Sequence, residues 1–371
     1  MTSIAVAGDF FVAPGSRPSI GPRLEGLLAG CDQALVNFEG PIAPGLAATF
    51  KSGPSIRQDP DAAGFAREMG FTVACLANNH ILDYGSSGLQ ATVEACAQVD
   101  IATVGWDSGE TTGGAVELAG LNRRVAIVNV CEAEWVRSPE GSGATVFSPV
   151  RTGRVVRAAA ADGQEPVVVL HGGNEYFPYP NPELRDAARF MIECGAAAVL
   201  MHHSHVVAGY EYWQGRPIAY GLGNFQFIMP SPRHDWFEGA VALLRWEGGG
   251  GPVLELLPTV VDRRTFTVEL AFGRDHSQAT NLIQARSQVL ASDASLAAHW
   301  QQFLQDSAAM YLRTAMPAGA SRQRLLSGAS ARFWRRYARS HPEELAYLLN
   351  VARCDSHRVA LTGVLEDLMP R

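Results

Sequence analysis

The 371-residue chain lacks long apolar runs, paired cysteines and an excess of basic residues. Its apolar runs all fall short of the roughly 18 residues that a membrane span needs, which predicts a protein without a membrane anchor. The first residues, MTSIAVAGDFF, carry no basic stretch and are not typical of a secretory signal. Lys and Arg total 30 against 37 Asp and Glu, a net charge of −7, which argues against a nucleic-acid partner.

The six cysteines are scattered, and no two form a CxxC pair. Such spacing is typical of reduced thiols in a protein core, so we predict a cytoplasmic protein without disulfides or a cysteine-bound zinc. Hydrophobic residues make up 47% and charged residues 18% of the chain, as in globular proteins. About two domains are expected at this length, whereas nothing in the sequence indicates the oligomeric state.

Short apolar, β-branched runs alternate with helical patterns in the first part of the chain. Strands in series with helices predict an α/β fold in which much of the sheet is buried. The expected strands lie at residues 4–7, 34–38, 72–76, 125–130, 167–170 and 197–201, and the expected helices at residues 61–69, 88–98, 153–161 and 182–194.

The pattern of apolar residues changes twice in the second part of the chain. Strand-like segments at residues 217–220, 240–246, 253–261 and 265–271 follow one another, which predicts an antiparallel meander. From Ser277 the pattern is helical, with long segments at residues 282–306 and 322–339. We therefore predict a catalytic α/β domain at residues 1–274 and an α-helical C-terminal region at residues 275–371 that is a candidate substrate-binding cap. A basic cluster at residues 332–339 fits either a solvated helix face or a site for an acidic partner.

Polar, metal-capable side chains follow six of the apolar runs. In open α/β sheets ligands bind at such strand ends, and five of the ten histidines lie at three of them. Carboxylate, carboxamide and imidazole together suit Mn, Fe, Zn or Ni, so we predict a site for one or two divalent metal ions and see no motif for an organic cofactor. The residues are Asp9; Asn37 and Glu39; Asn78, Asn79 and His80; His171 and Glu175; His202, His203 and His205; and Asn224.

The spacing of the last histidines leaves two geometries open. His203 and His205 are two residues apart, so they point the same way if they lie on an extended strand. If they lie on a loop, they can instead serve two different metal ions.

The order of these motifs resembles the CapA-type family, which is named for the synthesis of poly-γ-glutamate capsules and is a branch of the calcineurin-like metallophosphatases. The resemblance covers about residues 3–230 and leaves the helical tail outside. It implies a sandwich of two sheets flanked by helices, with a dinuclear metal centre at strand ends. The motifs are GlyAsp at 8–9, AsnPheGluGlyPro at 37–41, LeuAlaAsnAsnHis at 76–80, HisGlyGlyAsnGluTyr at 171–176, HisHisSerHisVal at 202–206 and GlyLeuGlyAsnPhe at 221–225.

The resemblance also implies roles for individual residues. Asp9 and His205 would hold one metal, and Glu39 stands where the superfamily has its bridging Asp. His80 matches the histidine that protonates a leaving group in phosphatases. The residues implied for the other metal are Asn79, His171 and His203.

Two departures from the family pattern stand out. The phosphatase AspXxxHis motif ends in Phe11 here, so the first metal lacks the histidine that this motif supplies. The CapA-type HisTrpGly motif has Gly172 in place of the tryptophan, which removes a bulky wall and is expected to open the pocket.

Further residues are assigned around this site. Lys51 and Arg57 on a Gly/Pro-rich loop, together with Asn224, are candidates for binding a substrate carboxylate or phosphate. Asp83 and Tyr84 are expected to orient His80. The remaining histidines are interpreted as structural, in the case of His202, or as surface residues, in the case of His234, His341 and His357.

Three classes of function remain open. The CapA-type pattern is linked to amino-acid polymers and not to phosphate esters. A chain without an anchor but with an added helical region resembles the peptide epimerase of lasso-peptide biosynthesis. That resemblance implies inversion of the α-carbon of a precursor peptide's C-terminal residue, a reaction in which two acid/base groups flank the carbon. His80 is the first candidate and Asp9 or Glu175 the next, with His276 or His299 as a partner from the tail.

The alternative enzyme class is a metal-dependent hydrolase of phosphoesters or of poly-γ-glutamate-like amide bonds. It would use the same metal ligands. A binding protein with a vestigial site is the third class, because Phe11 replaces a ligand histidine.

Overall fold

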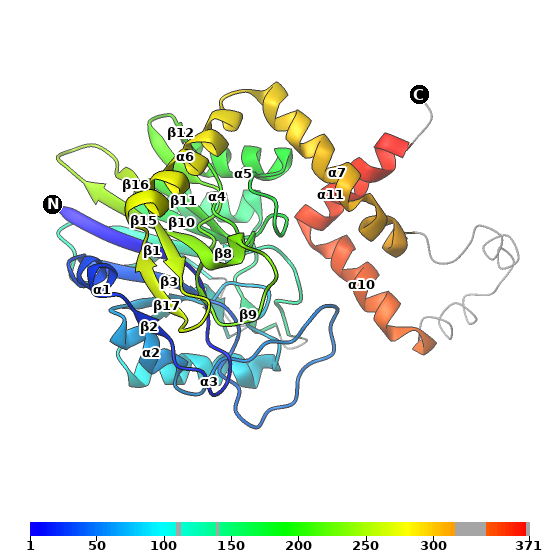
Figure 1. Cartoon of the computed structure of the whole chain (residues 1–371), viewed down its shortest axis with the longest axis horizontal. Helices are drawn as coiled ribbons and strands as arrows, with labels where there is room; N and C mark the ends of the chain where they lie inside the picture. Colours follow the sequence, from blue (N-terminus) through cyan, green and yellow to red (C-terminus); the bar gives the residue numbers. More distant parts are fainter. Residues whose placement is uncertain (109–112, 139–140, 316–338, 369–371) are drawn as a thin grey trace, which may run out of the picture.

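The computed structural model describes residues 1–108, 113–138, 141–315 and 339–368. Two β-sheets pack face to face, helices cover both outer faces, and further helices follow at the C-terminus (Figure 1). This arrangement confirms the predicted α/β sandwich of two sheets flanked by helices, with a C-terminal helical appendage. In the part of the chain that the structure describes, every helix is too short or too polar to cross a bilayer.

The larger sheet has the order β2-β17-β16-β15-β1-β3-β4-β5, and β14 pairs with the end of β1. β1 is central: it runs parallel to β3 and antiparallel to β15. Its strands are β1 (Thr2–Phe11), β2 (Ser19–Ile20), β3 (Gln33–Phe38), β4 (Val73–Cys75), β5 (Ala102–Val104), β14 (Asn224–Phe227), β15 (Glu238–Trp246), β16 (Val253–Val261) and β17 (Thr267–Leu270).

The smaller sheet has the order β12-β13-β11-β10-β8-β7, with a parallel centre from β8 to β13. Its strands are β7 (Val116–Glu117), β8 (Val125–Cys131), β10 (Glu165–His171), β11 (Ala198–His202), β12 (Tyr210–Trp213) and β13 (Arg216–Ala219). A separate two-stranded ribbon joins β6 (Trp106–Asp107) and β9 (Gly143–Ala144).

The predicted meander is only partly right. β15, β16 and β17 form it in the larger sheet. The segment at residues 217–220 does not join it, because β13 pairs in parallel with β11 and forms a hairpin with β12 in the smaller sheet. An alternating apolar pattern specifies a strand but not its sheet.

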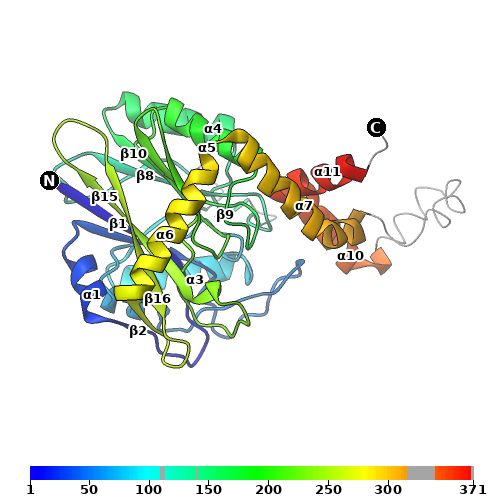
Figure 2. The ribbon, with the colours of Figure 1, turned by 45° about the horizontal axis from the view of Figure 1, so that its top comes forward.

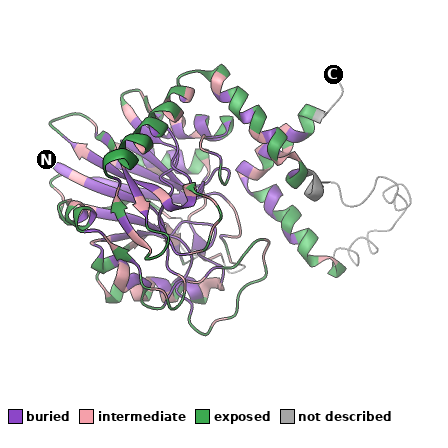
Figure 3. Cartoon of the chain, viewed as in Figure 1, coloured by how far each residue is buried: buried purple, intermediate pink, exposed green. Residues whose placement is uncertain are grey.

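Side chains along β1 alternate between the two faces of the larger sheet, and this alternation explains how the two sheets and the outer helices pack together. Ile4 and Val6 face the smaller sheet and pack with residues such as Ile127 of β8. Ala5 and Ala7 face outward against helices. Figure 3 shows that the central strands are almost wholly buried, whereas the helices expose one face. Burial of both sheet faces is the main apolar contribution to the stability of such a fold.

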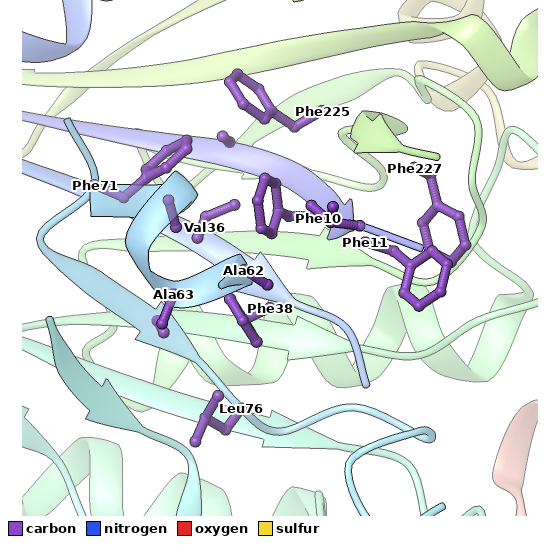
Figure 4. Close-up of a cluster of buried hydrophobic side chains, with 14 of the residues drawn as sticks. Phe10, Phe11, Val36, Phe38, Ala62, Ala63, Phe71, Leu76, Phe225 and Phe227 are labelled. Carbon is purple, nitrogen blue, oxygen red and sulfur yellow. The ribbon is translucent and has the colours of Figure 1, made fainter. Parts of the chain in front are cut away.

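Helices close the two outer faces of the sandwich. An aromatic-rich cluster that includes Phe10, Phe38 and Phe71 fills the space between the larger sheet and its helices (Figure 4). The helices on that side are α1 (Pro22–Ala29), α2 (Ala62–Glu68) and α3 (Gly85–Gln98), those on the smaller sheet are α4 (Pro149–Ala161) and α5 (Pro182–Glu193), and a short helix η1 (Asp235–Phe237) precedes β15.

The chain changes from strand to helix between Leu270 and Gly273, close to the predicted boundary. α6 (Gly273–Leu290) lies along the sandwich, and α7 (Asp293–Ala315), α10 (Pro342–Arg353) and α11 (Asp355–Leu368) project from one end (Figures 1 and 2). We call these last three the cap helices. The predicted helix at 322–339 and the basic cluster within it lie, apart from Arg339, outside the described residues.

Candidate metal centre

Strand register brings the predicted ligands from both sheets to one place. On β1, Asp9 lies opposite Asn37 of β3 and opposite Asn224 of β14. In the smaller sheet, His171 at the end of β10 lies opposite His202 at the end of β11. Because the parallel strands end at the same edge, their polar side chains converge there.

Close approach of backbones makes this convergence possible. A Cβ atom on Gly8 would lie 2.1 Å from the carbonyl oxygen of Gly223, so only glycine lets β1 pass this loop. The backbone amide of Asp9 then donates to the same Gly223 carbonyl at 2.9 Å. Asp9 is thereby fixed beside Asn224.

One half of the cluster is centred on Asp9, which is completely buried. Its Oδ1 accepts a hydrogen bond from Nδ2 of Asn37 at 2.8 Å, and Nδ1 of His202 lies 3.2 Å away. Its Oδ2 lies 3.3 Å from Nδ1 of His205. His202, which the sequence suggested to be structural, therefore lies within the cluster, and its Nε2 is buried without a hydrogen-bond partner.

The other half is centred on His171. Its Nε2 lies 2.9 Å from Oδ1 of Asn79 and 3.1 Å from Nδ1 of His203, while its Nδ1 faces Nδ2 of Asn37 at 3.2 Å. Asp9, Glu39 and His171 each offer one ligand atom, and these atoms lie within 4.8 Å of one another. The two halves are thus close enough to surround one or two ions.

Glu39 provides the test of whether a cation fits. The residue is completely buried, and neither carboxylate oxygen has a hydrogen-bond partner among the residues that the structure describes. Two imidazole nitrogens lie near its Oε1, Nε2 of His205 at 3.8 Å and Nε2 of His80 at 4.0 Å. An unpaired buried carboxylate is costly, and a divalent ion removes this cost. The donor set of carboxylates, carboxamide and imidazoles fits such an ion.

The two carboxyl groups differ in their pKa. Burial raises the pKa of Glu39 well above its usual range, and the negative charges of Asp9, Glu175 and Asp83 add to this effect. Burial also opposes ionisation of Asp9, but hydrogen bonds and charges from His202 and His205 outweigh it and hold its pKa well below the usual range. The neighbouring negative charges disfavour ionisation of Glu39 unless a cation compensates them.

The imidazoles also divide into two kinds. Burial, together with neighbouring imidazoles, lowers the pKa of His171 and of His203, which keeps both rings in the neutral form that binds metals. Burial lowers the pKa of His205 as well, but the carboxylates of Glu39 and Asp9 overcome this and raise it to about 10. A metal ion would take the place of this proton between the carboxylates.

His203 and His205 lie on a loop and serve different halves of the cluster. Both have left-handed backbone conformations, with φ of 90° and 54°. Strained conformations of this kind concentrate at functional sites. Their ring centroids are 6.4 Å apart, one ring toward His171 and the other toward Asp9. The loop geometry is therefore the correct one of the two alternatives.

His80 is held by a buried charged group. Its Nδ1 lies 2.7 Å from Oδ2 of Asp83 and 3.2 Å from Nζ of Lys51, and Lys51 forms an ion pair with Asp83. Asp83 therefore contacts His80 as predicted. Tyr84 instead packs against Arg57, whose guanidinium carbon lies 5.4 Å from the centroid of the Tyr84 ring.

A cavity of about 580 Å³ lies between this cluster and the cap helices. Lys51, Asn79, His80 and Glu175 line it on the domain side. The other predicted ligands lie deeper and expose at most 5% of their surface. The cap contributes Phe303, Met310 and Tyr311 of α7, Tyr347 and Asn350 of α10, and His357 of α11.

Four residues that the sequence suggested for the site do not line this cavity. Arg57 is not among the residues that line the cavity. Asn224 cannot reach a substrate, because it is completely buried and its Oδ1 and Nδ2 bond to His205 and to the Trp236 carbonyl. His276 and His299 are exposed and do not line the cavity.

The histidine of the tail that does line the cavity is His357, which the sequence suggested to be a surface residue. Its Nδ1 lies 3.1 Å from the Tyr311 hydroxyl and its Nε2 lies 3.4 Å from Glu134. His234 is a surface residue as expected, with 86% of its side chain exposed.

The two substitutions relative to the family pattern have structural explanations. Phe11, at the position of the missing histidine, is buried and packs on Phe227 with 4.9 Å between ring centroids (Figure 4). Gly172 does not open the pocket, since a Cβ there would lie 2.7 Å from Cγ of Glu132, whose side chain occupies this space.

Sequence reasoning missed Glu132 and Glu134, which contact the cap. Both follow the apolar run that forms β8. The same strand-end position that identified the predicted metal ligands was therefore the signal that could have found Glu132 and Glu134.

The two-sheet fold with carboxylate, carboxamide and imidazole groups gathered at its strand ends is that of an α/β protein with a candidate metal site at one edge of its sheets. The chain belongs to the bacterial capsule synthesis protein family PGA_cap, whose family model matches residues 14–229. This membership confirms the CapA-type resemblance.

Individual relatives agree with the family. The chain is 30% identical to the capsule biosynthesis protein CapA of Bacillus anthracis, over 52% of this chain and 48% of that protein. It is 26% identical to the PGA biosynthesis protein CapA of Bacillus subtilis, over 56% of this chain and 57% of that protein. The match thus spans about half the length of these relatives. Among solved structures, the sulfate thiohydrolase SoxB of Thermus thermophilus is 14% identical, with a TM-score of 0.41 over 80% of this chain and 60% of that one.

Proposed function

We propose that this protein is a metal-dependent enzyme that epimerises an α-carbon of a peptide, at the C-terminal residue of a lasso-type precursor. The observation that supports it most is the cavity between the strand-end cluster and the cap helices, which joins a candidate metal site to an added helical surface. Its volume of about 580 Å³ lies in the range of small-molecule and cofactor sites, about 300–1,000 Å³. Relatives named for capsule and PGA biosynthesis support a substrate built of amino acids.

The residues of the cluster would hold the metal in two groups. Asp9 and His205 form one group, and Glu39 lies between it and the second group. When bound, a divalent ion supplies Lewis acidity that polarises a carbonyl oxygen and so acidifies the neighbouring α-carbon. The second group consists of Asn79, His171 and His203.

His80 is the first acid/base group in this proposal. Asp83 fixes its Nδ1, so Nε2 is the nitrogen that remains for exchange of a proton with the substrate. Lys51 lies beside it at the cavity wall and would attract the carboxylate of the C-terminal residue.

Glu175 is the second acid/base group. It is exposed to the cavity, unlike Asp9, which is buried within the cluster. Epimerisation removes the α-proton to one base and returns a proton to the opposite face from the other, so no net atoms are gained. Among the described residues of the cap, His357 lines the cavity, but both of its ring nitrogens already have protein partners.

The test is a proton-exchange experiment. Protein loaded with Mn²⁺ is incubated in D₂O with lasso-type precursor peptides, and peptide mass is followed. The proposal expects one non-exchangeable deuteron per peptide without cleavage, abolished by chelator and reduced in His80→Ala. An unchanged peptide mass for all precursors, with a protein that retains bound metal, would overturn epimerisation.

Hydrolysis is the second candidate, because His80 also occupies the place of a leaving-group histidine beside Glu39, at 4.0 Å. In that case the peptide would gain one water and lose a fragment, or chromogenic phosphoesters would be cleaved. The same mass measurement and a phosphoester assay separate the two reactions.

A further inference from the structure

We propose that Glu134 is a positioning residue that ties the candidate metal centre to the cap helices. The residue lies in the loop after β8 and lines the cavity. Its two carboxylate oxygens face different partners: Oε2 accepts from Nδ2 of Asn79 at 3.4 Å, and Oε1 accepts from Nδ2 of Asn350 at 2.6 Å. One side chain thus joins a predicted metal ligand to α10.

The contact with Asn79 decides which end of its carboxamide faces the cluster. A carboxamide has an acceptor oxygen and a donor nitrogen, and only the oxygen can bind a metal. Because Glu134 accepts from the nitrogen, Oδ1 of Asn79 points toward Nε2 of His171, 2.9 Å away. A carboxylate behind a ligand fixes its orientation in the same way in other metal sites.

The cap holds Glu134 in this position. Besides Asn350, Nε2 of His357 at the start of α11 lies 3.4 Å from Oε1. His357 is in turn held by the Tyr311 hydroxyl of α7, 3.1 Å from its Nδ1. All three cap helices therefore converge on the carboxylate that orients Asn79.

Glu132, in the same loop, provides a matched comparison. Its Oε1 accepts from the Ser356 hydroxyl at 2.8 Å, and its Oε2 accepts from the Cys354 thiol and from the Gly173 amide, both at 3.3 Å. Glu132 thus also binds the α10–α11 junction, but its carboxylate bonds to the cap and to a backbone amide rather than to Asn79.

Docking of the cap and binding of the metal are coupled through Glu134. Such coupling is reciprocal, so a bound metal must tighten the cap by the same factor by which a docked cap tightens metal binding. The inference rests on the metal centre of the proposed function and is independent of the reaction catalysed there.

The test measures Mn²⁺ affinity by isothermal titration calorimetry in the full chain and its variants. Glu134→Gln offers one acceptor and one donor where the contacts with Asn79 and Asn350 need two acceptors. The dissociation constant of this variant for Mn²⁺ should therefore rise about 10- to 100-fold. Asn350→Ala, which changes only the cap, should raise it about fivefold or more. Glu132→Gln is the comparison: it loosens the cap without touching Asn79, so its dissociation constant should rise no more than that of Asn350→Ala and less than that of Glu134→Gln.

Hydrogen exchange supplies a readout independent of activity. Saturating Mn²⁺ should slow amide exchange in residues 342–368 of the wild type, and this protection should be lost in Glu134→Gln. Near-wild-type Mn²⁺ affinity in both Glu134→Gln and Asn350→Ala, with intact folding by circular dichroism, would overturn the inference and leave the metal centre in place. A wild-type protein that binds no Mn²⁺ would overturn the metal centre itself and the inference with it.

Discussion

Nε2 of His171 and Oδ1 of Asn79 lie 2.9 Å apart although the two residues belong to different sheets. His171 ends β10 of the smaller sheet, and Asn79 follows β4 of the larger one. The cluster therefore forms only when the sheets are packed, which makes metal binding a property of the folded sandwich. Ligands that bind only the native state stabilise it by mass action.

The first prediction follows from this linkage. At a free Mn²⁺ concentration of about 100 times the dissociation constant, the free energy of unfolding should rise by about 2.7 kcal/mol, which is a shift of several degrees in Tm. His171→Ala should abolish the shift, because it removes a ligand from the centre of the cluster. Differential scanning calorimetry with and without chelator is the measurement. His299→Ala, at an exposed position on α7, is the control and should show the same Mn²⁺-induced shift in Tm as the wild type. If His171→Ala retained this shift, the assignment of His171 as a metal ligand would be contradicted.

The second prediction concerns proton transfer. His80→Ala should lower turnover by about 100- to 10,000-fold, the usual contribution of a general acid or base. Mn²⁺ affinity should stay near the wild-type value, because His80 is placed next to the ligands and not among them. Steady-state kinetics and calorimetry on the same preparation separate the two effects. His234→Ala, on the surface, is the control. Turnover within about threefold of wild type would remove His80 from the mechanism.

The third prediction concerns acid stability at the base of the cap. Burial raises the pKa of Glu211, but hydrogen bonds from Arg189, Arg185 and Tyr220 outweigh this and lower it from 4.5 to about 2. Arg185 also binds Asp293 of α7 at 2.8 Å, so the pair links the domain to the cap helices. A carboxyl whose pKa is lowered by folding stabilises the protein above its unfolded pKa and loses this contribution as the pH falls through its folded pKa.

Glu211→Gln should therefore lower the free energy of unfolding by about 2 kcal/mol at pH 7, a figure reduced for partial solvent screening. The difference from wild type should shrink between pH 4.5 and pH 2. Urea titrations across this range give the measurement. Glu117→Gln removes an exposed partner of Arg124 and should change stability little. A difference that does not vary with pH would contradict the account.

The fourth prediction concerns the space beside Gly172. An alanine there would place its Cβ 2.7 Å from Cγ of Glu132, so Gly172→Ala should destabilise the protein by about 1–3 kcal/mol. Combining it with Glu132→Ala should cost less than the sum of the single changes, because the clash then disappears. Urea unfolding of all four proteins measures the coupling, and strictly additive costs would show that the two residues do not compete for space. Gly114→Ala, where no atom of the described residues lies within 4 Å of the added Cβ, is the matched control.

The sequence predicted the sandwich and most of the cluster for the same reason. The apolar runs of β1, β8, β10 and β11 are buried on both faces, so their pattern is strong, and the residues that follow them meet at one edge. Asn79 and His203 follow strands and His171 ends one, so packing of the two sheets brings them together at the same edge.

Features that depend on tertiary docking were not predictable in this way. His357 lies on a helix with no local signal of a cavity, and its place is set by how α11 packs on the domain. Asn224 has a chemically suitable side chain, but only burial reveals that both of its polar atoms are already used. The segment at 217–220 was recognised as a strand, whereas its parallel partner β11 lies some distance away in the chain.

The most direct test of the central claim is anomalous X-ray diffraction from crystals of the full chain soaked with Mn²⁺. The account predicts one or two anomalous peaks enclosed by Asp9, Glu39, His171, His203 and His205, and their loss in His171→Ala. Crystals that show these side chains in order at saturating Mn²⁺, but no peak between them, would contradict it.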